Sequence, residues 1–407
     1  MSVISLASKK ECTGCQACLC ACPKSAISME EDEFGFLFPR IDSQKCISCG
    51  ACQRSCPILG NAFLSDGQPD AYAVISNDDR KKSSSGGAFS VFARYVLAKG
   101  GVVFGACMDN RLRVFHTYIE SVDDLDVLRG SKYVQSFIGS SYKDAKNFLK
   151  QGRIVLFSGT PCQIAGLYAF LGKDRFENRL ITLDLVCHGV PNQRVFNKYC
   201  EKLSSKYKNK GRISNYLFRK LDSWSLITSV KFENEKNWLP LDGADNLYMQ
   251  MFFKGWTYRE SCLSCSFAKI KRPGTFTIAD FWGVGRHGIP FRKNIASGVS
   301  LVLDNYGQMC KIDSEIRKYC YLEKRTLSEA VSENQNLTSH VAYSCERETA
   351  IYDMLDAHTP LTEIASKYNL LHKENLTSIC VKLIKKMIHG LGLYNIYKTI
   401  NYKLGRR

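Results

Sequence analysis

Two cysteine runs close to the N-terminus decide the first part of the fold. Residues 12–23 read CTGCQACLCACP, and residues 46–57 read CISCGACQRSCP. Each run has the pattern Cys-x2-Cys-x2-Cys-x3-Cys-Pro, which is typical of chains that hold two 4Fe-4S clusters. Three thiolates of a run face one cluster, and the fourth, just before proline, points to the other cluster.

This crossed pattern predicts two ligand sets in a small ferredoxin-like α+β domain. The first set is Cys12, Cys15, Cys18 and Cys56, and the second is Cys22, Cys46, Cys49 and Cys52. Zinc is the alternative, because Cys-x2-Cys pairs also begin zinc ribbons. Zinc takes its thiolates in two pairs, however, and not in two runs of four. Cys20 lies outside the pattern, and we predict that it is a packed thiol.

The composition indicates a folded protein with an excess of positive charge. The 407 residues are 45% hydrophobic and 23% charged, which excludes a disordered chain. The net charge of +17 favours acidic partners. The N-terminus has no apolar signal segment, and no apolar run is long enough for a membrane span. We therefore expect a cytoplasmic protein whose 19 cysteines stay reduced and serve as ligands, redox groups or core residues.

Three regions differ in composition along the chain. Residues 1–62 form the predicted ferredoxin-type domain, and Ser65 to Asp70 read as a linker. Residues 70–325 alternate between strand and helix patterns. Residues 326–407 read as a helical, basic C-terminal region.

The alternation in the second region predicts an α/β (α+β) domain with a mostly parallel sheet. Strands are predicted at Tyr72–Ile75, Val102–Ala106, Arg153–Phe157 and Leu180–Val186, and helices at Ser85–Ala98, Gln163–Leu171 and Gln193–Ser205.

Four cysteines of the central region suggest a third 4Fe-4S cluster. Cys162 and Cys187 each follow a predicted strand, where ligands gather in open α/β sheets. Cys162 also begins a helix, whose N-terminus is expected to lower the thiol pKa. Cys262 and Cys265 supply a Cys-x2-Cys pair. The alternatives are ordinary buried thiols or a redox dithiol of the pair. The other cysteines, predicted to be core or surface thiols, are Cys107, Cys200, Cys310, Cys320, Cys345 and Cys380.

A serine- and glycine-rich loop opens the first central helix. Ser83 to Ala88 read SSSGGA, and such a loop at a helix start suits a phosphate group. A flexible polar loop is the alternative. Gly283-x-Gly285-x-x-Gly288 matches a dinucleotide fingerprint in its letters, but Pro290 follows and no helix pattern begins there. His188, beside Cys187, is a candidate proton donor or ligand, with a structural role as the alternative.

Several motifs taken in order resemble one known family. They are Ser85–Phe89, Arg129–Ser136, Gly159–Gln163, Cys187–Pro191, Cys262-x2-Cys265, Arg272, Asp280–Gly283 and Gly298–Ser300. Over about residues 1–325 the chain resembles the coenzyme F-420 hydrogenase/dehydrogenase beta-subunit family.

The resemblance implies an iron–sulfur flavoprotein with FAD in the central domain. It makes Cys162, Cys187, Cys262 and Cys265 the third-cluster ligands. The flavin contacts that it implies are Ser85, Gly86, Gly87, Gly130, Ser131, Lys132, Thr160 and Gln163. Lys132 would favour a reduced, anionic flavin or its phosphates, and Lys132 and His188 are the candidate catalytic residues. The implied partners are a ferredoxin-like redox protein and a small-molecule electron donor such as a deazaflavin.

The leading hypothesis is therefore an oxidoreductase that passes electrons between a reduced carrier or substrate, FAD and 4Fe-4S clusters. The first alternative is an electron-transfer subunit that serves a partner enzyme, for example in polysaccharide biosynthesis, and has no substrate of its own.

The C-terminal tail suggests a further alternative. It carries Lys382, Lys385, Lys386, Lys398, Lys403, Arg406 and Arg407, interleaved with Tyr394, Tyr397 and Tyr402. Leu361 to Leu371, with Thr359 as N-cap, faintly resembles a helix-turn-helix. A solvated helix face is favoured here, ahead of an anionic membrane surface and of nucleic acid, which is the least favoured partner.

Overall fold

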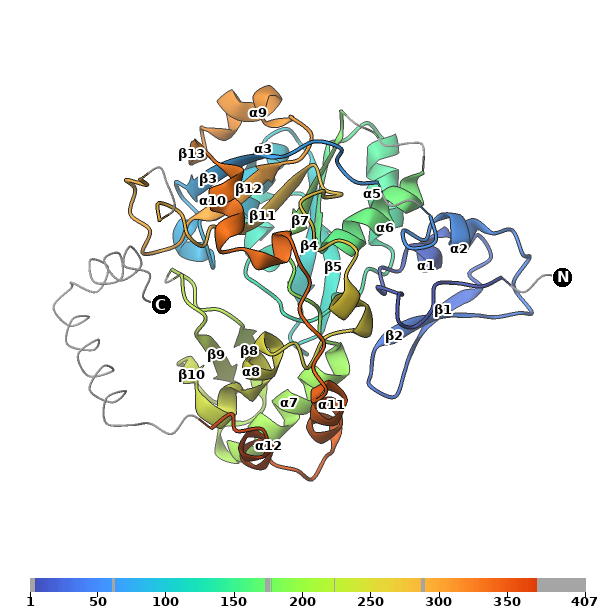
Figure 1. Cartoon of the computed structure of the whole chain (residues 1–407), viewed down its shortest axis with the longest axis vertical. Helices are drawn as coiled ribbons and strands as arrows, with labels where there is room; N and C mark the ends of the chain where they lie inside the picture. Colours follow the sequence, from blue (N-terminus) through green and yellow to red (C-terminus); the bar gives the residue numbers. More distant parts are fainter. Residues whose placement is uncertain are drawn as a thin grey trace.

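The computed structural model describes residues 4–60, 63–172, 176, 178–222, 224–286 and 290–371. Figure 1 shows the N-terminal segment at one side of a large twisted sheet, with a smaller sheet and its helices below. Within the described residues, no helix is long and apolar enough to cross a membrane.

The N-terminal segment contains two short helices and one hairpin. Helices α1 (Ala17–Ala21) and α2 (Ala51–Arg54) each begin inside a cysteine run. Strands β1 (Ile27–Glu31) and β2 (Leu37–Ile41) pair antiparallel between them. This arrangement agrees with the predicted small α+β region.

The central sheet has eight strands in the order β13-β3-β12-β11-β7-β6-β4-β5. In chain order these are β3 (Asp70–Ser76), β4 (Val102–Met108), β5 (Val114–Ile119), β6 (Val155–Gly159), β7 (Leu180–Leu185), β11 (Phe276–Asp280), β12 (Ser300–Asp304) and β13 (Cys320–Arg325).

The sheet is mixed, so the expectation of a mostly parallel sheet is wrong. The adjacent strands β11, β7, β6 and β4 are parallel, as the alternating pattern predicted. The other four pairs, β11–β12, β12–β3, β3–β13 and β4–β5, are antiparallel. A hairpin joins β4 to β5, whereas helix α9 (Met309–Ile316) lies between β12 and β13 in the chain, and the direction of these outer strands cannot be read from their apolar pattern.

Helices cover both faces of this sheet (Figure 1). The first face packs on α3 (Ala88–Leu97), α4 (Leu125–Leu128) and α9 (Met309–Ile316). The second face packs on α5 (Ser141–Lys150) and α6 (Pro161–Leu171), and farther along on α10 (Leu327–Ser332). The buried strands are therefore apolar on both sides, and their ends are the places left for polar chemistry.

The smaller sheet supports a second apolar core. Its strands are β8 (Ile213–Leu217), β9 (Thr228–Phe232) and β10 (Leu239–Leu241), in the antiparallel order β10-β9-β8. Its helices are α7 (Gln193–Lys206), α8 (Leu247–Phe253), α11 (Arg347–Leu355) and α12 (Leu361–Lys367), which share one cluster of buried residues with the sheet.

The structure differs from two expectations, one about the predicted linker and one about the N-cap of helix α12. Ser65, in the predicted linker, is buried and its hydroxyl accepts a hydrogen bond from the Arg272 N–H at 3.2 Å. Thr359 is not the N-cap of α12. That position is Pro360, and Thr359 donates its N–H to Asp356 at 2.8 Å.

Helices α10 to α12 agree with the predicted helical region. Its basic residues, from Lys382 to Arg407, lie outside the described residues, and so does Cys380.

The serine- and glycine-rich loop precedes α3 and does not belong to it. The helix begins at Ala88, because Gly87 has a left-handed backbone (φ 88°) that ends the preceding loop. Gly86 lies against two strands: an added Cβ would collide with the Val74 carbonyl oxygen of β3 and the Ser300 nitrogen of β12. Gly86 is thus required by packing.

We therefore expect Gly86→Ala to destabilise the protein by about 1–3 kcal/mol, the usual cost of overpacking a closed site. The measurement is the thermal unfolding midpoint under anaerobic conditions. Gly67→Ala is the control, because nothing lies within 4 Å of the added Cβ there. Equal midpoints for the two variants would contradict the packing role of Gly86.

Candidate metal centres and cofactor cavity

The second predicted ligand set lines one cavity near the surface of the N-terminal segment. All four thiols, Cys22, Cys46, Cys49 and Cys52, lie in its wall. Cys49 is exposed, and the neighbouring Ile47 is 57% exposed. This set is therefore the most exposed of the three predicted ligand sets.

The first predicted set is more deeply placed. Burial, with smaller contributions from the neighbouring thiols Cys12 and Cys56, raises the pKa of the Cys18 thiol to about 12. Cys15 is buried, and Cys18, Cys162 and Cys12 contribute to its raised pKa after burial itself. Cys56, from the second run, therefore lies near Cys12 and Cys18 of the first run.

This first set lies directly against the central domain. The Cys15 side chain packs on Gly166 of α6: a Cβ added there would meet the Cys15 sulfur at 3.0 Å. Helix α6 carries Cys162 in its first turn. The off-pattern Cys20 is buried and donates to the Gly139 carbonyl at 3.2 Å, as a packed thiol would.

The third predicted set lines a cavity of its own. Cys162, Cys187, Cys262 and Cys265 all lie in its wall. They come from the start of α6, the segment after β7, and the short 3-10 helix η5 (Glu260–Ser264) with the residue that follows it. Among the described residues, no three His, Cys, Asp or Glu side chains are arranged to hold a single metal ion. The four thiols therefore line one common space.

The pKa of the Cys162 thiol is higher than the sequence predicts. Burial raises its pKa to about 11, whereas the helix start was expected to lower it. The desolvation of a charge outweighs the helix N-terminus in this dry site. Its sulfur instead lies 3.2 Å from the Thr160 hydroxyl. Thr160 caps the helix together with Gln163, whose side-chain oxygen accepts the Thr160 N–H at 3.0 Å.

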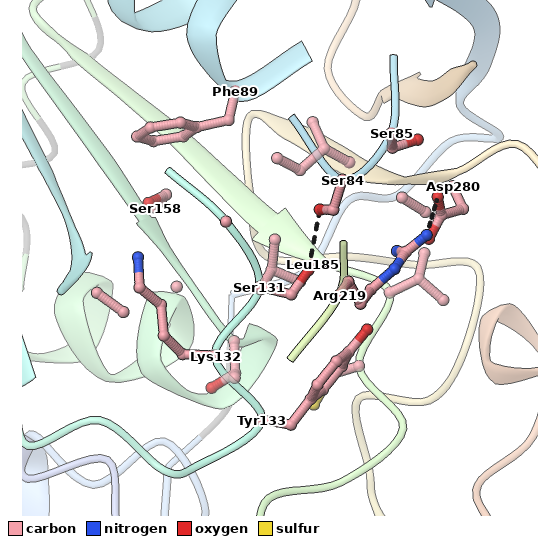
Figure 2. Close-up of a pocket in the computed structure, with 18 of the residues that line it drawn as sticks. Ser84, Ser85, Phe89, Ser131, Lys132, Tyr133, Ser158, Leu185, Arg219 and Asp280 are labelled. Atoms are coloured by element: carbon pink, nitrogen blue, oxygen red, sulfur yellow. Dashed lines mark hydrogen bonds and ion pairs between the residues drawn. The ribbon is translucent and has the colours of Figure 1, made fainter. Parts of the chain in front are cut away.

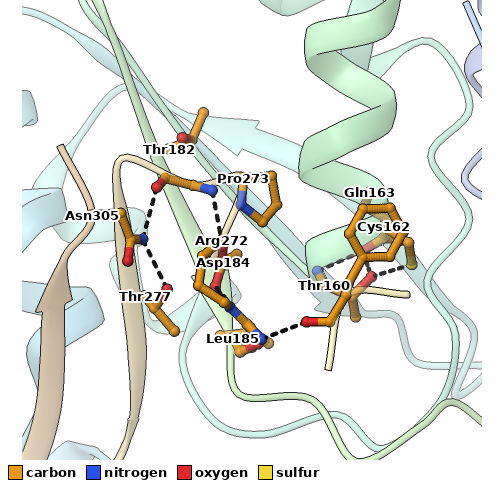
Figure 3. Close-up of polar contacts among 12 residues, drawn as sticks. Thr160, Cys162, Gln163, Thr182, Asp184, Leu185, Arg272, Pro273, Thr277 and Asn305 are labelled. Carbon is orange, nitrogen blue, oxygen red and sulfur yellow. Dashed lines mark hydrogen bonds and ion pairs between the residues drawn. The ribbon is translucent and has the colours of Figure 1, made fainter. Parts of the chain in front are cut away.

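A buried ion pair holds the segments around this third cavity (Figure 3). Arg272 donates to Asp184 of β7, with the Nη2–Oδ1 distance at 2.9 Å and both side chains at most 1% exposed. Arg272 also donates to the carbonyls of Phe267 and Leu185. The second Asp184 oxygen accepts the Gly274 N–H at 2.9 Å. The segment after Cys265 is thereby tied to the strand that leads to Cys187.

A larger cavity, of about 300 Å³, lies at the edge of the sheet where the parallel strands end (Figure 2). Ser158 of β6, Leu185 of β7 and Asp280 of β11 reach it from three adjacent strands. The loop before α3 adds Ser84, whose hydroxyl lies 3.1 Å from that of Ser131.

Most of the predicted cofactor contacts line this cavity. They are Ser85, Gly87, Gly130, Ser131, Lys132, Thr160 and Gln163. Gly86 is not in its wall, because it is packed between β3 and β12. His188 is in the wall and exposed. Residues 187–190 line both this cavity and the third thiol cavity, so the two sites share a wall.

Lys132 supplies a cation to the cavity. Its ammonium donates to the carbonyls of Leu128 (3.0 Å) and Arg129 (2.7 Å), and it forms no ion pair within the described residues. Burial lowers its pKa from 10.5 to about 8. The side chain is therefore charged at neutral pH and able to pair with an anion.

Sequence reasoning missed an ion pair in this wall. Arg219 binds Asp280 through two contacts, Nη1–Oδ2 at 2.5 Å and Nη2–Oδ1 at 3.2 Å. The Trp224 indole N–H donates to the same carboxylate at 2.7 Å. Asp280 stands in a quoted motif, but its partners come from a distant loop and carry no motif of their own.

A buried histidine was missed as well. His116 of β5 has its Nε2 at 2.9 Å from the Ser158 carbonyl and its Nδ1 at 2.8 Å from the Ser136 hydroxyl. Burial lowers its pKa to about 4, so it is neutral at pH 7. Since a carbonyl only accepts, Nε2 carries the proton. The only sequence signal was a polar residue at an inward position of a strand.

Comparisons with known proteins identify two segments. Residues 11–58 match the family model for a 4Fe-4S dicluster domain, and residues 38–90 match a second model of the same description. Residues 152–329 match the family model for the C-terminal part of the beta subunit of coenzyme F420 hydrogenase/dehydrogenase. No curated protein matches the chain.

One similar solved structure is a chain of the F420-reducing NiFe hydrogenase complex from Methanosarcina barkeri. It is 15% identical, with a TM-score of 0.45, and the alignment covers 67% of this chain and 92% of that one. From the family models, this chain combines a 4Fe-4S dicluster domain with the C-terminal domain of the coenzyme F420 hydrogenase/dehydrogenase beta-subunit family.

Proposed function

We propose that the chain is an iron–sulfur flavoprotein oxidoreductase, with FAD in the central cavity and one 4Fe-4S cluster on each thiol set. The observation that carries the proposal is the continuity of the sites. The central cavity shares the wall of residues 187–190 with the third thiol cavity. Cys162 of that cavity lies on helix α6, and Cys15 of the first set packs against the same helix.

The residues of the central cavity suit a flavin nucleotide. Ser84, Ser85 and Ser131 present hydroxyls, and Lys132 presents a cation that pairs with no carboxylate in the described chain. The cavity size is at the lower end of those that take cofactors, which are about 300–1,000 Å³. A bound flavin connects two-electron hydride donors with one-electron clusters. Lys132 would hold an anionic part of the cofactor, and the buried His116 would keep its single proton on Nε2.

The thiol sets extend from this cavity to the protein surface. The third and first sets are buried or half-buried, and the second set includes the exposed Cys49. Electrons that enter at the cavity would therefore leave beside Cys49 and Ile47. This surface exit also favours the second candidate, an electron-transfer subunit without its own substrate. Anaerobic turnover of a hydride donor by the isolated chain would distinguish the first candidate from the second.

The chain as purified anaerobically should contain about twelve irons, from three clusters of the 4Fe-4S type. Cys162→Ser should lose about four, since it removes one ligand of the third set. The measurement is iron and sulfide per chain, with the visible spectrum. Cys310→Ser is the control, because Cys310 is an exposed thiol outside all three sets. A wild type with eight irons and a full complement of flavin would show that the four central thiols hold no cluster.

Flavin binding should weaken as the pH rises through 8. Lys132 is charged below its pKa of about 8 and neutral above it, so an anionic ligand loses its cation. If the bound anion holds the proton on Lys132, the FAD affinity should fall about ten-fold between pH 7 and pH 9, because one pH unit corresponds to a factor of ten. Fluorescence titration of the deflavinated protein measures this change.

Lys132→Gln is the matched variant for the pH experiment. It should bind FAD more weakly at pH 7 and show little change up to pH 9, because it has no charge to lose. The assignment of Lys132 would be wrong if the variant kept the pH dependence of the wild type.

A further inference from the structure

Arg259 lies at the junction between the third thiol cavity and the N-terminal segment. It immediately precedes η5, and its carbonyl accepts the Cys262 N–H at 3.0 Å. Its own N–H donates to the Val190 carbonyl at 3.0 Å, in the wall shared by both cavities. The side chain is fully buried. Its backbone is thus part of the third site.

The guanidinium of Arg259 reaches the first cysteine run. Nη2 donates to the Leu37 carbonyl of β2, and the guanidinium lies 4.3 Å from the centre of the Phe38 ring. A Cβ added to Gly14 would collide with this guanidinium. Gly14 lies between Cys12 and Cys15, so the cation packs against the loop that carries two ligands of the first set.

A second contact joins the same two segments. The Ser261 hydroxyl, two residues after Arg259, donates to the Cys12 carbonyl at 3.2 Å. The Arg259 Nε also donates to the Gln135 side chain at 3.3 Å, and Gln135 in turn donates to the Thr13 carbonyl at 2.8 Å. The guanidinium is therefore held in a fixed place between the two sites.

The charge of this guanidinium is not neutralised by a carboxylate. Within the described residues Arg259 forms no ion pair, and its buried Nη1 has no hydrogen-bond partner. After burial, which lowers the pKa of Arg259, the groups that act on this pKa are the thiols Cys12, Cys262 and Cys162 of the first and third sets, followed by the carboxyl group of Asp32. A buried, unpaired donor is costly, so its presence points to an acceptor that arrives with the clusters.

We propose that Arg259 is a positioning residue that sets the reduction potentials of the first and third clusters and supplies its Nη1 donor to one of them. The proposal rests on the proposed function, which places clusters on these thiols. The step concerned passes one electron from the third cluster to the first. The third cluster is oxidised by one electron, the first is reduced by one, and no bond or proton moves.

The sign of the effect follows from charge. Reduction adds one negative charge to a cluster, and a fixed cation in a site of low dielectric stabilises the reduced form. Hydrogen bonds and net charge near the cluster are established determinants of its potential. Arg259 should therefore raise the potentials of both clusters and keep the electron within the buried part of the path.

The test is a redox titration followed by electron paramagnetic resonance on the full-length, anaerobically purified protein. Arg259→Gln should shift the reduction equilibrium of the first and third clusters about ten-fold toward the oxidised form, which is about 59 mV for one electron. Arg259→Lys retains the charge and should stay close to the wild type. Arg212→Gln is the control for net charge, because Arg212 is 85% exposed. Unchanged potentials in an Arg259→Gln protein with full iron content would overturn the proposal.

A second measurement does not depend on the glutamine variant. In wild-type protein labelled with 15N-arginine, a reduced cluster should show weak 15N hyperfine coupling that disappears in Arg259→Lys. A wild type without this coupling would remove Nη1 as a donor, and the proposal with it. A wild type with eight irons would instead show that the third cluster is absent. The potential of the first cluster would then test the proposal: it should still shift in Arg259→Gln, and an unchanged potential would contradict the proposal.

Discussion

Arg272 and Asp184 form an ion pair at most 1% exposed, and the segments around the third thiol cavity are tied to it. Asp184 belongs to the strand that leads to Cys187, and Arg272 donates to the carbonyl of Phe267, just after Cys265. The same guanidinium donates to Leu185 at the wall of the central cavity. Removing one partner of such a pair typically costs about 3–5 kcal/mol, because the other charge stays buried. The pair therefore links the position of the thiols with that of the central cavity.

The two buried arginines near the thiols have different surroundings. Arg272 is neutralised by Asp184, so it fixes geometry and adds little net charge. Arg259 has no carboxylate partner in the described chain, so it keeps its charge between two thiol sets. Lys132 likewise pairs with no carboxylate among the described residues of the central cavity. Among the other buried arginines, Arg219 and Arg325 are paired with carboxylates, whereas Arg347 donates to the Tyr258 carbonyl. Under the proposed function, Arg259 and Lys132 would meet the anionic groups of the clusters and of the flavin.

The sequence predicted the secondary-structure elements of the central region better than their arrangement. Helices at Gln163–Leu171 and Gln193–Ser205 and the strand at Leu180–Val186 match α6, α7 and β7 within two residues. These elements are recognisable because their apolar periodicity is local. The antiparallel strands β12 and β13 were not predicted, since alternation gives no sign of the partner or direction of a strand. The sequence predicts Gly86 as a cofactor contact, because a glycine needed for packing and one needed by a ligand look alike in sequence.

The cysteine runs alone determined the ligand sets proposed for the N-terminal segment, because the spacing of a cluster motif is a property of a short stretch of chain. Cys262 and Cys265 were also recognisable as a pair, whereas joining them to Cys162 and Cys187 relied on strand ends and on a family resemblance. Only the tertiary structure decided the rest: the wall of residues 187–190 shared by two cavities, the contact of Cys15 with α6, and the position of Arg259 on Gly14. These contacts join residues far apart in the chain. Their energy comes from burial and charge pairing in the folded interior, which no local pattern records.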